Sequence, residues 1–363
     1  MNLFPALERA YTKESLSARE AQRMAEYIAW APLIFRTARV MVKSGILQLI
    51  RESEEGLTAG EIAESSGYSI YAVKVLTEAS LSAGIILVDK ESSRFTISKT
   101  GWFLLTDEAT RVNMDFNHSV NYRGMYHLEE ALKEGRPAGL KSLGDWPTIY
   151  QGLSQLPPDA QRDWFAFDHF YSDHSFSSAL KLIFSKKCSR IMDVGGNTGR
   201  FALKCTEYNP DVKVTVVDLP GQIEMMKRAI SGSVGESRIE AFPADLLKSG
   251  SKLPQGEWDA IWMSQFLDCF SIEEIASILS KAKEVMGSKS TLYIMETFWD
   301  RQKYEPASLC LTMTSLYFTV MANGNSKMYH SDDFLSVIES VGLKVAAIHD
   351  GLGHGHSIME VTL

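Results

Sequence analysis

The chain has 363 residues and a formal net charge of −8, from 37 lysines and arginines against 45 aspartates and glutamates. This length exceeds what one typical hydrophobic core uses and favours two domains. A protein that neutralises many phosphates needs a basic surface, so the acidic balance disfavours nucleic acid as the main partner. Because no apolar run approaches the ~20 residues that span a bilayer, we expect no membrane partner either.

The cysteine pattern and the first residues of the sequence indicate in which cellular compartment the protein is expected. The four cysteines show no CxxC spacing and no paired histidines, which argues against a disulfide framework or a zinc site. The beginning of the sequence lacks the basic end and long apolar run that are typical of a secretory signal. We therefore expect a cytoplasmic protein with reduced thiols.

A long helix is expected from about residue 17 to 42, where apolar residues recur at spacings of three and four. This segment carries more apolar surface than one small core would use. Burial within its own domain and burial against a second copy of the chain both remain open.

Two helices and two short strands are predicted next, at about 58–67, 70–82, 85–88 and 94–98. A helix, a turn, a helix and a hairpin form the winged-helix pattern. The second helix carries one lysine, Lys74, and no arginine, whereas a recognition helix needs side chains that reach bases and phosphates. A structural role is therefore favoured over DNA binding.

The hydrophobic pattern of the sequence changes after residue 186. Short apolar strands then alternate with helices, and we expect strands at 189–194, 213–218, 258–263 and 290–295. Near-continuous apolar strands separated by helices indicate a parallel sheet that is covered on both faces. Two final strands, expected at 342–349 and 356–361, can pair antiparallel and close the sheet.

A glycine-rich turn follows the first parallel strand, in Asp193-Val-Gly195-Gly196-Asn197-Thr-Gly199. Such a turn at the carboxyl end of a strand is where doubly wound sheets bind nucleotides. Asp218 ends the next strand 19 residues after Gly199, where an acid can bond both ribose hydroxyls.

The details of this turn separate two cofactor classes. Asn197 breaks the G-x-G-x-x-G spacing that a dinucleotide needs for its pyrophosphate. The carboxylate of Asp193 would repel a pyrophosphate but could hold an ammonium group. S-adenosylmethionine has no phosphate and carries an ammonium and a sulfonium. The pattern therefore favours this cofactor over a dinucleotide and over an ordinary strand-to-helix turn.

Acidic residues also follow later strands. Asp245 comes after the third strand and offers a carboxylate to an adenine amino group, with a surface loop acid as the alternative. Asp268 follows strand 258–263, at the end that faces the ligand crevice in open sheets, although it could also cap a helix. The histidines near the carboxyl end lack acidic or cysteine ligands at suitable spacing, so no metal site is expected. One of them, His330, stays as an alternative base.

On these residues the chain resembles the S-adenosylmethionine-dependent O-methyltransferases, such as the plant caffeic-acid and flavonoid enzymes and their bacterial relatives. The likeness covers nearly the whole chain and is most specific at the glycine-rich turn, at Val217-Asp218-Leu219-Pro220 and at Asp245-Leu246. It implies an α/β fold with a doubly wound, Rossmann-like methyltransferase sheet, mostly parallel with an antiparallel closing strand. A mainly α winged-helix dimerisation domain precedes it. We place this domain in 1–109 and the methyltransferase domain, with its acceptor-pocket helices, in 110–363.

The resemblance also implies S-adenosylmethionine as methyl donor and a homodimer built on amino-terminal helices. The glycine-rich turn would line the methionine part, Asp218 would bind the ribose, and Asp245 with Leu246 would flank the adenine. Tyr171 matches a frequent methionine near the cofactor, and Ser264 replaces a lysine of the plant members. The implied cofactor residues are Tyr171, Asp193, Gly195, Gly196, Asn197, Gly199, Asp218, Leu219, Asp245, Leu246 and Ser264.

The catalytic positions depart from the family pattern. Aligning Phe270-Ser271 with the family's Trp-Ser places Asp268 where the family has its histidine base. Glu296 matches a glutamate that orients the base, and Met328 replaces a second glutamate. An aspartate with the usual pKa of about 3.9 is a weak base for a phenol near about 10, but burial and a nearby acid can raise it. Asp268 as base, as inert structural acid and as substrate-binding group all stay open.

The 15 methionines and the 10% aromatic residues suit a flat, apolar acceptor. The expected pocket residues, each of which can equally be an ordinary core residue, are Tyr122, Met125, Tyr126, Trp164, Phe167, Met313, Tyr317, Phe318 and Met321. The favoured function is methylation of a hydroxyl on a small apolar or aromatic molecule. The alternatives are a catalytically silent relative that binds the cofactor or a small ligand in a regulatory or structural role, and a DNA-binding regulator.

Overall fold

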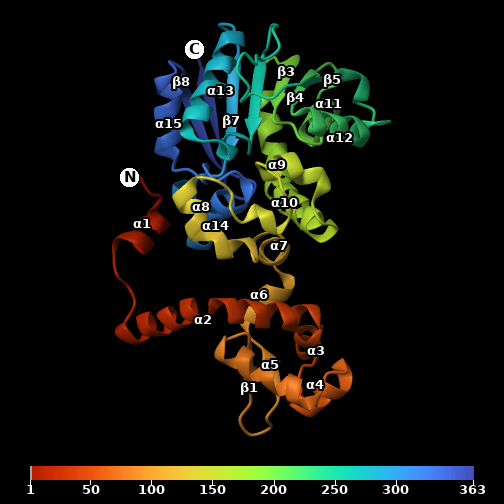
Figure 1. The fold of residues 1–363 in the computed structure, drawn as a ribbon, viewed down its shortest axis with the longest axis vertical. Helices are drawn as coiled ribbons and strands as arrows, with labels where there is room; N and C mark the ends of the chain where they lie inside the picture. The colour runs from red at the N-terminus through yellow and green to blue at the C-terminus, as the bar shows by residue number, and fades with distance from the viewer. Residues whose placement is uncertain (1) are drawn as a thin grey trace. The chain divides into compact units, whose positions relative to one another are not determined.

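The computed structural model describes residues 2–363, which divide into two compact units (Figure 1). One unit spans Glu14–His118, and the other joins the segment that ends at Lys13 to Ser119–Leu363. The domain boundary suggested by the sequence, between 109 and 110, falls inside helix α7 (Glu108–Phe116). The two units separate shortly after that helix.

The smaller unit is mainly helical. Its remaining elements are α2 (Ala18–Lys43), α3 (Ile46–Glu52), α4 (Ala59–Ser66), α5 (Ile70–Ser82), β1 (Ile86–Val88), β2 (Phe95–Ile97) and α6 (Lys99–Thr106). Capping boxes formed by Ser17 with Glu20 and by Thr58 with Glu61 begin α2 and α4, because each satisfies backbone donors that the helix leaves open. Strands β1 and β2 pair antiparallel. The predicted order of helix, helix and hairpin is therefore confirmed.

The larger unit is built on a seven-stranded sheet. In chain order its strands are β3 (Arg190–Val194), β4 (Lys213–Asp218), β5 (Ile239–Pro243), β6 (Ala260–Ser264), β7 (Thr291–Glu296), β8 (Lys344–Leu352) and β9 (His356–Thr362). They lie side by side in the order β5-β4-β3-β6-β7-β9-β8. The first five are parallel, and β9 pairs antiparallel with β7 and β8. This confirms the predicted doubly wound sheet with an antiparallel closing strand.

Helices cover both faces of this sheet, which explains why the central strands β3, β4, β6 and β7 are buried along most of their length. Met192 and Val194 of β3 pack on the face covered by α13 (Ile272–Val285) and α15 (Ser331–Ser340). Ile191 lies on the opposite face, because side chains alternate along a strand. Three helices cover that face, namely α10 (Pro158–Ile183), α11 (Arg200–Tyr208) and α12 (Pro220–Ile230).

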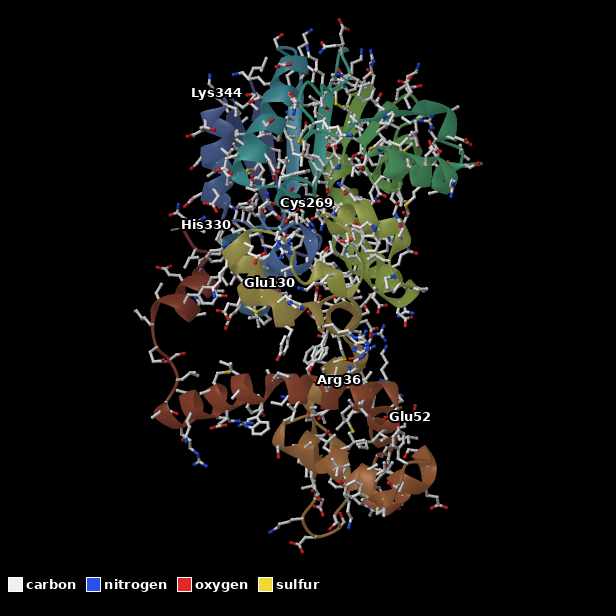
Figure 2. All side chains as sticks on the ribbon, in the orientation of Figure 1. Arg36, Glu52, Glu130, Cys269, His330 and Lys344 are labelled. Atoms are coloured by element: carbon white, nitrogen blue, oxygen red, sulfur yellow. The ribbon has the colours of Figure 1, made fainter. Side chains whose placement is uncertain are left out.

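A further group of helices lies beyond the carboxyl ends of the parallel strands (Figure 1). It comprises α8 (Leu128–Glu134), α9 (Ile149–Gly152) and α14 (Glu305–Tyr317). Helix α1 (Pro5–Thr12) packs against α14, where the Tyr11 hydroxyl donates a 3.1 Å hydrogen bond to Ser308 Oγ. Cys269 lies between the sheet and this group of helices (Figure 2). Among the described residues, no helix is both long and apolar enough to cross a membrane.

Candidate functional site

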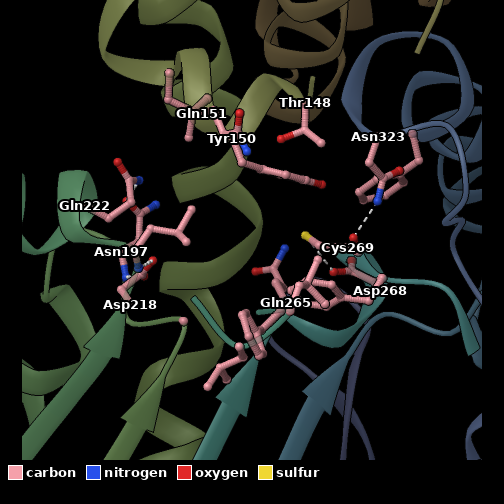
Figure 3. Close-up of a pocket in the computed structure, with 18 of the residues that line it drawn as sticks. Thr148, Tyr150, Gln151, Asn197, Asp218, Gln222, Gln265, Asp268, Cys269 and Asn323 are labelled. Carbon is pink, nitrogen blue, oxygen red and sulfur yellow. Dashed lines mark hydrogen bonds between the residues drawn. The ribbon is translucent and has the colours of Figure 1, made fainter. Parts of the chain in front are cut away.

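A cavity of about 470 Å³ opens at the carboxyl ends of the parallel strands, a volume within the range of small-molecule sites (Figure 3). The chain runs from β3 to β4 and β5 on one side, and from β6 to β7 on the other. Strand order therefore reverses between β3 and β6, which is where open α/β sheets bind ligands. Gly195 follows β3 and Gln265 follows β6, and both line the cavity.

The turn after β3 has a backbone that only small side chains permit. Gly195 has a φ of +78°, and a Cβ there would lie 2.3 Å from the Phe266 ring. Gly199 has a φ of +77°, and a Cβ there would lie 2.8 Å from Met226. Asn197 between them also adopts a positive φ, of 48°, which asparagine tolerates better than most residues. At Gly195, which lines the cavity, a ligand can therefore approach the bare backbone closely.

Asp218 and Asn197 form the polar part of one end of the cavity (Figure 3). Asp218 Oδ2 accepts a 2.8 Å hydrogen bond from the Asn197 backbone N–H, and Oδ1 accepts one of 2.7 Å from Leu219 N–H. Each oxygen keeps a lone pair, so the carboxylate can accept two more donors, such as a pair of ribose hydroxyls. Burial raises the pKa of Asp218 to about 6, against the opposing effect of these two N–H groups.

Asp193 lies beneath the turn and does not line the cavity. Its Oδ2 lies 2.7 Å from the place where a Gly196 Cβ would be, and this buried oxygen has no hydrogen-bond partner among the described residues. Burial, followed by the charge of Asp218, raises the pKa of Asp193 to about 8. A cation above the turn would stabilise its ionised form. Contact of Asp193 with a cofactor ammonium stays a prediction.

The other predicted cofactor residues separate into two groups. Leu219, Asp245 and Leu246 line the cavity together with Gly195, Asn197 and Asp218. Four others do not line it, namely Tyr171, Gly196, Gly199 and Ser264. The Tyr171 ring instead lies against Phe167, with the centroids 5.0 Å apart, and Ser264 is the last residue of β6. The roles assigned to these residues stay predictions.

At the other end of the cavity, Asp268 lies on the short helix Leu267–Cys269, which follows β6. Its side chain is only 5% exposed, and Oδ1 accepts a 3.5 Å hydrogen bond from the Cys269 thiol. Glu296, at the end of β7, lies behind this turn and does not line the cavity. Its Oε1 accepts backbone N–H groups of Phe266 at 3.2 Å and Leu267 at 2.9 Å.

Asp268 and Glu296 are both buried away from water, which affects the pKa of each carboxyl. Burial raises the pKa of both carboxyls, and the charge of Asp268 raises that of Glu296 further. Two negative charges in this buried region would be unfavourable, so ionisation of one carboxyl disfavours ionisation of the other. Glu296 thus contacts the turn that carries Asp268 through backbone hydrogen bonds, and its role in orienting a base stays a prediction.

Aromatic side chains form the walls around Asp268. Trp164, Phe167, Tyr317 and Phe318 line the cavity, as the sequence suggested, and Trp164 Nε1 donates a 2.7 Å hydrogen bond to the Tyr317 hydroxyl. The other expected wall residues do not line the cavity, namely Tyr122, Met125, Tyr126, Met313 and Met321. Tyr126, on the short 3-10 helix Gly124–His127, is 94% exposed, whereas Met321 is buried against Gly124.

Several polar lining residues were not anticipated from the sequence. They are Thr148, Tyr150, Gln151, Gln222, Gln265 and Asn323 (Figure 3). Gln265 was detectable in principle, because it directly follows a strand whose carboxyl end faces the crevice. Its φ is 46°, and its buried Oε1 has no hydrogen-bond partner within residues 2–363. Tyr150 lies on a four-residue helix that gives no periodic signal. His330 does not line the cavity, since it caps α15 and its Nε2 bonds Asn2 O at 3.0 Å.

The sheet with its antiparallel β9, the glycine-rich turn after β3 and the acid that ends β4 define a class I methyltransferase fold. The sequence model of the O-methyltransferase domain matches residues 166–344, and that of the Dimerisation2-like domain matches residues 22–95. Residues 166–344 therefore belong to the O-methyltransferase domain family, and a segment that matches the Dimerisation2-like domain precedes them.

Named relatives and solved structures agree with this assignment. Over 186 residues the chain is 27% identical to norreticuline-7-O-methyltransferase of Papaver somniferum, covering 51% of this chain and 48% of the relative. It is 27% identical over 176 residues to O-methyltransferase pgmB of Aspergillus terreus, covering 48% and 40%. The chain thus spans about half the length of the first curated relatives it matches.

Two solved structures share the fold over nearly the whole chain. The mitomycin 7-O-methyltransferase MmcR superposes with a TM-score of 0.69 at 19% identity, covering 95% of this chain and 98% of the other. The O-methyltransferase NcsB1, solved with S-adenosylmethionine and 2-hydroxy-5-methyl naphthoic acid, gives a TM-score of 0.65 at 19% identity, covering 96% and 99%. At this level of identity the likeness establishes the fold.

Proposed function

We propose that this protein is an S-adenosylmethionine-dependent O-methyltransferase that methylates a hydroxyl of a small aromatic molecule. The observation that carries the proposal is a single cavity with two chemically distinct ends. One end offers a bare turn and the carboxylate of Asp218, and the other offers aromatic walls around Asp268. The family assignment and the named relatives support the same reading.

The residues at the end with the glycine-rich turn fit the cofactor. Asp218 has lone pairs left for the ribose hydroxyls. Among the described residues, Asp245 Oδ1 accepts one hydrogen bond, of 3.1 Å from the Leu247 N–H, so it can accept another donor. The orphaned oxygen of Asp193 beneath the turn suits a cation above it. When bound, S-adenosylmethionine supplies a methyl group whose bond to sulfur breaks as its bond to the acceptor oxygen forms.

The residues at the second end bind the acceptor and take its proton. Trp164, Phe167 and Tyr317 confine a flat ring, and much of the rate in such a displacement comes from holding the reacting atoms in line. Asp268 accepts the hydroxyl proton, because burial lifts the pKa of this carboxyl toward the range in which a base works near neutral pH. Its neighbour Glu296 fixes the turn that carries it.

The smaller unit supports a homodimer. The Dimerisation2-like match covers most of α2, and this helix exposes Met24, Ile28, Trp30 and Leu33. Exposed apolar side chains on one helix are typical of a surface that another chain covers. The cytoplasmic location expected from the cysteine pattern stays a prediction.

The proposed function is tested by incubating the full chain with S-adenosylmethionine and a panel of hydroxylated aromatic compounds. We expect a product that is one methyl group heavier by mass spectrometry, formed together with S-adenosylhomocysteine. Calorimetry should show that S-adenosylhomocysteine binds. Binding without transfer on the whole panel would support the silent alternative, and absence of binding would overturn the proposal.

A further inference from the structure

Two carboxyl groups, Asp168 and Asp268, line the cavity next to its aromatic walls, and neither forms an ion pair with another described residue. Asp168 lies on α10 one helical turn after Trp164, between the aromatic walls and the Asn197 amide from which it accepts a 3.4 Å hydrogen bond. Asp268 accepts a 3.5 Å hydrogen bond from the Cys269 thiol. Both donors are neutral, and the bond from the Asn197 amide is long for an N–H donor. Burial, followed by the charge of Asp268, raises the pKa of Asp168 to about 7.

The nearby basic residues, Lys248 and Arg200, do not neutralise the negative charge of Asp168 and Asp268. Lys248 is the one lysine or arginine among the described residues that line the cavity, and its Nζ lies 3.7 Å from Asp245 Oδ2. Arg200 lowers the pKa of Asp168 from a distance, but its guanidinium pairs with Asp173 at 2.6 Å and does not line the cavity. The aromatic end therefore carries an excess of negative charge whenever its acids ionise.

The walls of this end suit a cation as well as an aromatic ring. Trp164, Phe167, Phe270 and Tyr317 line it together with Phe318. The faces of aromatic rings attract ammonium groups, and the attraction grows when water is excluded. An anionic ligand would meet both the carboxyls and the ring faces, which repel it, whereas a cation is attracted by both.

We propose that the methyl acceptor is an aromatic hydroxyl compound that carries a protonated amine, with the amine paired to Asp168 and the hydroxyl facing Asp268. This inference rests on the proposed function and names its substrate class. It assigns different tasks to the two acids: Asp168 selects the charge of the acceptor, and Asp268 receives the proton of its hydroxyl. Acceptors that carry a carboxylate in place of the amine are disfavoured.

The test compares matched compounds that differ in one group. Tyramine, tyrosol and 4-hydroxyphenylacetate share a phenol and carry an amine, a neutral hydroxyl and a carboxylate; serotonin, 5-hydroxytryptophol and 5-hydroxyindole-3-acetate repeat the series on a larger ring. Binding is measured by calorimetry on the full chain loaded with S-adenosylhomocysteine, which lacks the sulfonium charge. Methyl transfer is measured separately with S-adenosylmethionine.

In at least one series we expect the amine to bind about 10-fold or more tightly than the neutral compound, the size of a charge-assisted hydrogen bond, and the carboxylate to bind most weakly. In Asp168→Asn the preference for amine over neutral compound should vanish, while Asp211→Asn, the same change at the far end of β4, should retain it. A simple loss of stability would not change this ratio.

Two results would overturn the inference. One is equal or weaker binding of the amines in both series, including their failure to bind at all, and the other is an unchanged preference in Asp168→Asn. These outcomes differ from failure of the proposed function, which would appear as absence of S-adenosylhomocysteine binding or of methyl transfer. Amine-selective binding without transfer would support the charge selection while contradicting the catalytic role.

Discussion

Asp268 is the residue on which the proposed chemistry depends most directly. Replacing its carboxylate by the isosteric amide in Asp268→Asn removes the proton acceptor but keeps the size of the side chain. We expect kcat to fall about 100-fold or more, the usual contribution of a general base, while S-adenosylhomocysteine binds as before. The matched control Asp211→Asn changes an exposed aspartate next to the amino end of β4 and should leave kcat unchanged.

The rate of methyl transfer should depend on pH through the ionisation of Asp268. The base must be ionised, and burial raises the pKa of Asp268, so the wild-type rate should rise with pH above the usual range of an aspartate. Asp268→Asn should lose this rise. Steady-state rates between pH 5 and 9 measure it, and an acidic limb that persists in the variant would assign the titration to another group.

Asp218 makes cofactor affinity depend on pH. Its carboxylate accepts hydroxyl donors only when it is ionised, and burial raises its pKa to about 6. The group therefore holds a proton below that pH, and affinity for S-adenosylhomocysteine should fall as pH drops through 6, by about 10-fold from pH 7 to pH 5. Calorimetry across this range measures the effect. Asp218→Asn should bind weakly throughout, and a full pH step in that variant would contradict the assignment.

Glu296 connects strand β7 to the turn after β6. Lying at the end of β7, it accepts two backbone N–H groups from the turn after β6, so one side chain fixes the position of Asp268. Glu296→Gln resembles the protonated acid and should keep the unfolding free energy within about 1 kcal/mol and kcat within a few-fold. Glu296→Ala leaves both donors without a partner and should lower the unfolding free energy by about 2–3 kcal/mol.

Denaturant unfolding and steady-state kinetics measure both variants. The paired substitutions separate two roles, because a direct proton-transfer role would make the glutamine as inactive as the alanine. Equal, large losses of kcat in both variants would therefore contradict the positioning role and return Glu296 to the chemical step.

Across the whole molecule, the sequence predicted the elements whose signal is local. Apolar strands, the glycine-rich turn and the acid at Asp218 are each visible within a short stretch of sequence, and the structure places them as expected. The acceptor end is assembled instead from distant segments. Tyr150 on a four-residue helix and Asn323 after α14 meet above the turn after β6, which only tertiary packing brings about. Burial by such packing also decided which aromatic residues face the cavity.

We expect two chains to assemble through the exposed apolar face of α2. On α2 the side chains of Met24 and Ile28 are 52% and 70% exposed in a single chain, and they lie one helical turn apart. Placing aspartates at both positions would bury two charges in an apolar contact between copies, but would disturb little in a single chain. Sedimentation should give twice the 40.5 kDa chain mass for the wild type and a shift towards one chain mass for Met24→Asp with Ile28→Asp.

The control for this variant is Lys90→Asp, in the turn of the β1–β2 hairpin, where the side chain is 89% exposed. It changes the net charge by the same amount as the two aspartates on α2, so any effect of charge alone would appear in both proteins. Circular dichroism verifies that α2 remains helical. A double variant that keeps the wild-type mass would show that this face of α2 does not join the copies, and the apolar residues Trp30 and Leu33 would then be the next to replace.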